Sequence, residues 1–186
     1  MRPRGRESMI GWRLPAGVIM GSTVAVLDLT IIVPILTVIG RDLGGGTSIA
    51  WLLAAFLVSS TVAMPLWGRA FDVIGERCSY IAAMATFALG TVAAIAAPSL
   101  SLLIVTRIVQ GIGAGGLVPL GRAVLARRAG PEARARLQVW YSVAFAGAAA
   151  AGPLLGSWIV GVGSWRWAFA VLLPAIAVTA ILIVPE

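Results

Sequence analysis

Two charged residues stand alone inside long apolar runs of this sequence. Asp28 lies in the run 14–39, and Arg107 lies in the run 100–125. A charged side chain at the centre of a bilayer costs about 3 kcal/mol on insertion scales, so it is retained where it has a function and a partner. We therefore expect Asp28 and Arg107 to contact each other between two helices. A static structural ion pair is the alternative interpretation, since many buried pairs have no further role.

The depths of the two residues allow this contact. A helix rises 1.5 Å per residue, which places Asp28 roughly 16 Å and Arg107 roughly 10 Å below the outer ends of their helices. Burial disfavours the charge of a carboxylate and a neighbouring guanidinium favours it. A carboxyl group balanced in this way can bind or release a proton as its access to water changes. It can then exchange that proton for a cationic or polar solute.

The composition is that of an integral membrane protein. Of 186 residues, 60% are hydrophobic and 11% are charged, and the mean hydropathy is +0.99. Such a chain is too apolar for a soluble domain with a polar surface. It has no histidine and one cysteine, Cys78, so we expect no intramolecular disulfide, no metal site and no cofactor. No nucleophile with a base and an orienting third group is visible, so we do not expect an enzyme.

Six apolar runs are long enough to cross a membrane as helices. They span residues 14–39, 50–67, 78–97, 100–125, 137–162 and 168–184, after a basic amino terminus at residues 1–13. The first run is longer than the core of a secretory signal and contains Asp28, which disfavours the alternative of a cleaved signal. We predict an all-α membrane protein with six transmembrane helices in residues 14–186.

The arginines are distributed unevenly between the two sides of these spans. All 14 basic residues are arginines, and the net charge is +7. Eleven arginines fall in the amino terminus, in 68–77 and in 122–136, whereas the opposite loops hold only Arg41 and Arg166. The positive-inside rule then places both termini in the cytoplasm of a multi-pass plasma (inner) membrane protein. Arginines between apolar runs set orientation, so we expect no nucleic-acid partner.

The residues after Arg107 contain a run of glycines. Gly111 to Gly116 matches the G-x-G-x-x-G pattern of dinucleotide-binding loops, but that motif requires a soluble strand, turn and helix. Inside a membrane span, Gly111 and Gly115 instead form a small-residue face for close helix packing. Gly152 and Gly156 form a second such face. Between them Pro153 removes one backbone donor and should bend the helix, either as a packing kink or as a hinge.

The segment 68–77 is predicted to be a compact charged turn between two spans. Gly68 and Gly75 permit the backbone to turn tightly there. Asp72 can meet a helix amino terminus or an arginine such as Arg77. A solvated turn with local salt bridges is the alternative to a role in conformational change.

Several of these motifs together resemble the amino-terminal half of a major facilitator superfamily transporter. Arg107, Gln110, Gly111 and Gly113 resemble the R-x-x-Q-G-x-G motif of helix four, which the family uses in proton coupling. The family's loop between helices two and three, G-x-L-a-D-r-x-G-r-k, is matched by Gly68, Asp72, Gly75 and Arg77 and departs at Ala70, Val73 and Glu76.

Two further elements favour the subgroup of fourteen-helix drug:proton antiporters. Leu27 to Thr30 is similar to the L-D-x-T element of helix one, although Val33 replaces a usual asparagine. Trp165 to Phe169 fits the opening of helix six. Apart from the subgroup, Gly152, Pro153 and Gly156 resemble the superfamily's G-P-x-x-G antiporter motif of helix five, which departs here at Ala148 and Ser157.

The resemblance implies a proton-coupled antiporter of multidrug type that exports amphipathic or cationic small molecules. Asp28, Arg107 and Gln110 would couple protons to substrate. Members of this superfamily place the substrate site between two six-helix halves, so the six spans here imply either a homodimer or a missing second half. The alternative is a non-transporting assembly subunit, or an inactive truncated fragment, that binds other helices through its glycine faces. The partners of the transporter would be the lipid bilayer, protons and a small-molecule substrate, whereas the alternative would bind other membrane helices only.

Overall fold

The computed structural model describes residues 13–44, 46–128 and 130–183, and these residues form a helical bundle without strands. The expected all-α class is therefore confirmed for this part of the chain. The predicted basic amino terminus, apart from Arg13, lies outside the described residues, as does the end of the predicted sixth span at residue 184.

Five helices of the described residues are long and apolar enough to cross a membrane. They are α1 (Arg13–Leu43), α2 (Trp51–Ile74), α3 (Glu76–Ile95), α4 (Leu100–Arg128) and α5 (Pro131–Val162), and a short 3-10 helix, η1 (Gly46–Ala50), precedes α2. A shorter apolar segment follows, made of α6 (Trp167–Ala170) and α7 (Leu172–Ile183). A complete sixth span stays a prediction.

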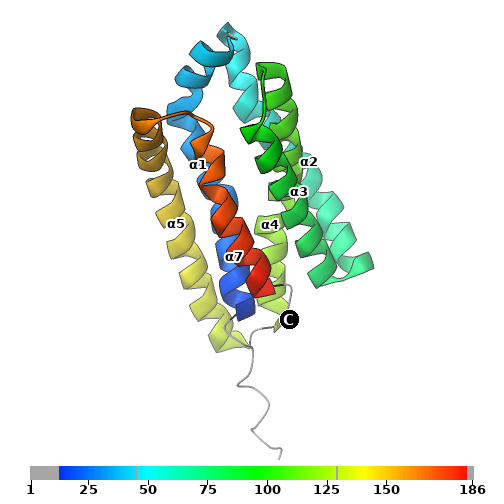
Figure 1. Ribbon diagram of the computed structural model, residues 1–186. Coiled ribbons are helices and arrows are strands. Elements are labelled where there is room, and N and C mark those ends of the chain that lie inside the picture. Colours follow the sequence, from blue (N-terminus) through cyan, green and yellow to red (C-terminus); the bar gives the residue numbers. More distant parts are fainter. Residues whose placement is uncertain (1–12, 45, 129, 184–186) are drawn as a thin grey trace, which may run out of the picture.

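The long helices lie side by side, with α4 between two groups (Figure 1). The most extensive contacts join α4 to α2 and α3, and join α1 to α5, while α7 packs on α1. Contacts between α1 and α4 connect the groups. We name the two ends of the bundle by residues: at the Gly75 end α2 stops and α3 begins, and at the Asp42 end α1 stops. The α1–α4 contact is what brings the two isolated charges within reach of each other.

Glycines make these helix contacts close. A Cβ atom at Gly115 would overlap the carbonyl oxygen of Ser60, and one at Gly111 would overlap the side chain of Ser59, both on α2. On α5, a Cβ at Gly152 would overlap Thr30, and one at Gly156 would overlap the Ile31 carbonyl oxygen, both on α1. Both predicted small-residue faces are thus in use inside the chain.

The segment 68–77 differs from its predicted conformation. Helix α2 continues through Gly68 to Ile74, and Gly75 alone separates it from α3. The prediction that Gly68 turns the backbone is therefore wrong. Gly75 has φ +87°, a conformation that favours glycine, whereas Gly68 is an exposed helical residue with no atom near the position of a Cβ. A glycine in a sequence permits such a turn without requiring one.

At the Asp42 end, one cluster joins three segments. Asp42 of α1 accepts a hydrogen bond from Trp165 Nε1 at 2.7 Å and pairs with Arg166 at 3.4 Å. Arg166 also donates to the Ala97 carbonyl after α3, at 3.0 Å. Its guanidinium lies 4.3 Å from the centre of the Trp165 ring. The cluster fixes the start of α6 against the ends of α1 and α3.

Candidate functional site

Asp28 and Arg107 meet at the centre of the bundle, as the sequence predicts. Asp28 lies on α1 and Arg107 on α4, and Arg107 Nη1 donates to Asp28 Oδ2 at 2.6 Å. Both side chains are 0% exposed. Two opposite charges in hydrogen-bond contact neutralise each other, which makes their burial tolerable.

Helix α2 holds the guanidinium from another side. Arg107 Nε donates to the Leu52 carbonyl oxygen at 3.3 Å. The guanidinium carbon lies 4.3 Å from the centre of the Phe56 ring, in a cation–π contact. Nη2 is buried and has no hydrogen-bond partner among the described residues. The guanidinium therefore keeps the two N–H groups of Nη2 for a further acceptor.

Gln110 completes the pair, one helical turn after Arg107. Its Oε1 accepts from Arg107 Nη1 at 2.8 Å, and its Nε2 lies 3.4 Å from Asp28 Oδ1. The same Nε2 donates to Thr91 Oγ1 of α3 at 3.0 Å. We name Asp28, Thr91, Arg107 and Gln110 the central network. Three helices supply its side chains, and all four are fully buried.

Thr91 is the member that sequence reasoning missed. A threonine within an apolar helix is an ordinary residue, because its hydroxyl can bond the carbonyl one turn earlier. Thr91 does make that bond, to Phe87 at 2.9 Å. Only the packing of α3 against α4 shows that its oxygen also meets Gln110, so no local signal marked it.

The other predicted residues lie elsewhere. Gly68, Asp72, Gly75 and Arg77 are at the Gly75 end, where Asp72 pairs with Arg127 of α4 at 3.3 Å. On α5, Gly152 contacts α1 two residues from Asp28, at Thr30, whose hydroxyl donates to the Ala148 carbonyl at 3.3 Å. Helix α5 runs through Pro153 as one helix. The structure thus separates the 68–77 motif from the central network and places Gly152 next to that network.

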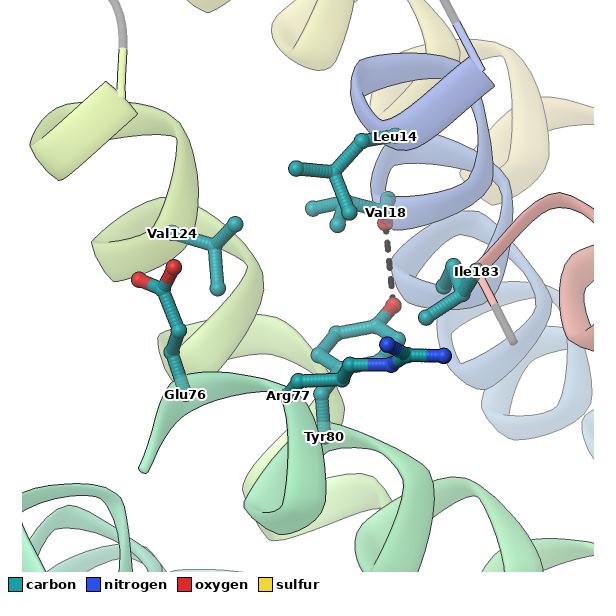
Figure 2. Close-up of a pocket in the computed structure, with 7 residues that line it drawn as sticks. All are labelled: Leu14, Val18, Glu76, Arg77, Tyr80, Val124 and Ile183. Carbon is teal, nitrogen blue, oxygen red and sulfur yellow. Dashed lines mark hydrogen bonds between the residues drawn. The ribbon is translucent and has the colours of Figure 1, made fainter. Parts of the chain in front are cut away.

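Three cavities in the described part of the chain are lined by residues outside the central network. One of these cavities, of about 20 Å³, lies at the Gly75 end. The residues that line it are drawn in Figure 2, among them Tyr80, whose hydroxyl donates to the Val18 carbonyl at 3.2 Å. Val18 lies roughly 15 Å along α1 from Asp28. Two apolar grooves, of about 480 Å³ between α2 and α4 and about 550 Å³ beside α5 to α7, are lined by other residues. In this conformation the carboxyl group is closed off.

Comparisons with known proteins agree with the geometry. The family model described as the Major Facilitator Superfamily matches residues 18–186. The chain is 32% identical to "Multidrug resistance protein B homolog" of Mycobacterium tuberculosis (strain CDC 1551 / Oshkosh), over 93% of this chain and 34% of that protein. It is 31% identical to "Multidrug transporter protein MdtP" of Bacillus subtilis (strain 168), over 91% of this chain and 31% of that protein.

Solved structures share the fold. The D-xylose-proton symporter superimposes with a TM-score of 0.80 at 17% identity, over 94% of this chain and 48% of that one. The human organic anion transporter MFSD10 (TETRAN) gives 0.74 at 20% identity, over 95% and 47%. The chain thus spans about a third of the curated relatives and about half of these structures.

Proposed function

This chain belongs to the Major Facilitator Superfamily, and from that premise we propose that it is one six-helix half of a proton-coupled exporter of amphipathic or cationic small molecules. The names of its relatives in Mycobacterium tuberculosis and Bacillus subtilis support drug efflux. Its coverage of about half of two transporter structures supports work with a second half. That half is either a second copy of this chain or a segment absent from it.

We place the Gly75 end in the cytoplasm of an inner (plasma) membrane, with Trp167–Ile183 belonging to the sixth span. The distribution of charge supports this orientation. The Gly75 end carries seven exposed arginines: Arg13, Arg69, Arg77, Arg122, Arg127, Arg134 and Arg136. Arg41 and Arg166 are the arginines described at the Asp42 end. By the positive-inside rule, the arginine-rich end is cytoplasmic.

The carrier of the proton is Asp28, and the observation that supports this role is its fully buried contact with Arg107 at 2.6 Å. A proton taken from water neutralises the carboxylate. Arg107 is then left with neutral acceptors, the Gln110 amide and the Leu52 carbonyl. A buried cation without a counter-ion is costly, so protonation favours a conformer in which water or a substrate reaches the guanidinium. The free N–H groups of Arg107 Nη2 suit such an acceptor.

The other family motifs support the movement between conformers. Asp72 at the end of α2 pairs with Arg127 of α4 across the Gly75 end, and this contact stabilises one conformer. Gly152 and Gly156 allow α5 to approach α1 next to the central network. Pro153 lies between them and shapes α5 at the substrate path.

Transport in proteoliposomes tests the role of Asp28. The vesicles contain the wild-type protein and a pH-sensitive dye that reports the internal pH. Adding a cationic, amphipathic compound as substrate should change that pH. Asp28→Asn should abolish that change, because the amide cannot exchange a proton. Glu132→Gln, at an exposed carboxylate in the first turn of α5, is the matched control and should keep proton coupling. Undiminished coupled flux with Asp28→Asn would contradict the proposal.

Chemical cross-linking in native membranes tests the second half. A species of two chains should appear if the chain acts as a homodimer. Transport by a strictly monomeric species would rule the homodimer out.

The alternative function is a non-transporting assembly subunit, or an inactive fragment. This alternative requires glycine faces that are free to bind other helices. In the structure, Gly111 and Gly115 contact α2 of the same chain, and Gly152 and Gly156 contact α1. Their faces are therefore not free for another protein. Vesicles in which no added solute changes the internal pH would favour this alternative.

A further inference from the structure

Helix α3 contributes one polar side chain to the central network. Thr91 is 0% exposed. Its hydroxyl donates to the Phe87 carbonyl at 2.9 Å, and its oxygen accepts from Gln110 Nε2 at 3.0 Å. The preceding residue is Gly90, where a Cβ atom would lie 2.6 Å from the Gln110 backbone nitrogen. The absence of a side chain at Gly90 is what lets Thr91 reach the Gln110 amide.

The hydrogen bonds around Gln110 select one orientation of its amide. Because the Thr91 proton is given to Phe87, its oxygen presents a lone pair and needs a donor. On the other side, Arg107 Nη1 is a donor and needs an acceptor. A turned amide would place Oε1 against the oxygens of Thr91 and Asp28, and Nε2 against Nη1. The contacts with Asp28 and Arg107 would be repulsive, and so would the contact with Thr91 as long as its hydroxyl donates to Phe87.

We propose that Thr91 is a positioning residue that keeps the Gln110 Nε2 group directed at Asp28 in both protonation states of the carboxyl group. The charged groups that face this amide are Asp28 of α1 and Arg107 of α4. Of the other helices, α2 supplies Leu52 and Phe56 to Arg107, and α3 supplies Thr91 to Gln110. When Asp28 is neutral, its hold on Nε2 weakens, and Thr91 retains the orientation. The importance of this for coupling rests on the proposed function.

The sequence offers a direct spectroscopic test. It contains two glutamines, Gln110 and Gln138, and no asparagine. Glutamine labelled with ¹⁵N therefore gives two side-chain amide pairs in an NMR spectrum of the full chain in nanodiscs. Gln110 is buried and Gln138 is exposed, so the Gln110 pair is the one that exchanges slowly with water. No transport activity is needed for this measurement.

Thr91→Val keeps the shape of the side chain and removes the hydroxyl. We expect the chemical shifts of the Gln110 amide pair to change. Its exchange with water should accelerate about fivefold, which corresponds to the loss of one hydrogen bond of typical net strength. Thr91→Ser should restore the wild-type chemical shifts and the slow exchange of the Gln110 pair. Thr86→Val is the matched control, since the Thr86 hydroxyl donates to Ala82 at 2.8 Å on the same helix. It should leave the Gln110 pair unchanged.

Neutralising Asp28 sharpens the test. In Asp28→Asn the Gln110 pair should keep its slow exchange, and adding Thr91→Val should accelerate it by more than in the wild-type background. An unchanged Gln110 pair in Thr91→Val, with the Gln138 pair and helix content intact, would overturn the proposal. Should Thr91→Val fail to fold, Thr91→Ala supplies the same comparison.

The two proposals can fail separately. Coupled transport that survives Asp28→Asn, together with a shifted Gln110 pair in Thr91→Val, would remove the proposed function and leave the positioning role. Loss of coupling in Asp28→Asn with an unchanged Gln110 pair in Thr91→Val would do the reverse.

Discussion

The molecule contains the same kind of ion pair in two very different places. Asp28 and Arg107 are 0% exposed and join α1 to α4 at 2.6 Å. Asp72 and Arg127 join α2 to α4 at 3.3 Å at the Gly75 end, where their side chains are 72% and 58% exposed. Around the buried pair, α2, α3 and α4 supply further hydrogen bonds and an aromatic ring. In the second pair, the Arg127 guanidinium lies 4.4 Å from the centre of the Phe71 ring.

The contrast between the two pairs shows that the stability a pair contributes does not explain why the buried pair is present. An exposed pair contributes about 0–1 kcal/mol, since water already solvates both charges. A buried pair gives little net stability over apolar side chains of the same volume, because removing both charges from water is costly. The central pair is thus expensive to break and of small net benefit to folding. Such a pair is better explained by a function that needs a charge at that depth.

The largest effect is expected from removing one partner of each pair. Asp28→Ala leaves the buried Arg107 without a counter-ion and should lower the free energy of unfolding by about 3–5 kcal/mol. Asp72→Ala should lower it by less than about 1 kcal/mol. Titration of the purified protein with SDS in mixed micelles measures both.

A double variant serves as the control for this comparison. Asp28→Leu combined with Arg107→Leu removes both charges. Its free energy of unfolding should fall much less than the sum of the decreases in the Asp28→Leu and Arg107→Leu single variants. Equal losses in Asp28→Ala and Asp72→Ala would show that the burial of the central pair has no energetic consequence.

Glycines provide the next contrast between the two regions. Gly115→Ala places a Cβ against the Ser60 carbonyl, and overpacking of this kind costs about 1–3 kcal/mol. Gly68→Ala places it in open space on the exposed face of α2, where a better helix former stabilises by up to about 1 kcal/mol. The same SDS titration should therefore give opposite signs. Two changes of the same sign would contradict the assigned helix packing.

The central pair was predictable because its members have no equivalents. Asp28 and Arg107 are the charged residues well inside apolar runs, so each required a partner and each was the other's natural choice. Their pairing depends on depth and on the cost of isolated charge, both of which the sequence expresses. Gln110 was named with Arg107 through the family motif alone.

The rest depended on information that spacing does not carry. Thr91 has the signature of an ordinary helical threonine, and its contact with Gln110 follows from where α3 lies on α4. Gly68 and Gly75 have the same residue type, and only the backbone distinguishes the helical glycine from the one at φ +87°. Asp72 was expected to meet a helix amino terminus or an arginine such as Arg77, and the structure adds Arg127, 55 positions along the chain.

Salt provides the smallest and most selective comparison. In a double-mutant cycle, Asp72→Ala and Arg127→Ala should give a coupling energy of about 0.2–1 kcal/mol at low salt. The cycle is needed because Arg127→Ala alone also removes the contact with Phe71. Raising the ionic strength from 0.1 M to 1 M shortens the screening length from about 10 Å to about 3 Å, so this coupling should fall towards zero. The same cycle on Asp28 and Arg107 should be nearly insensitive to salt, because ions do not reach a pair with no exposed surface. A salt-sensitive central pair would mean that water already reaches Asp28 in this conformer, and the closed state would then have to be assigned to a different arrangement of α1 and α4.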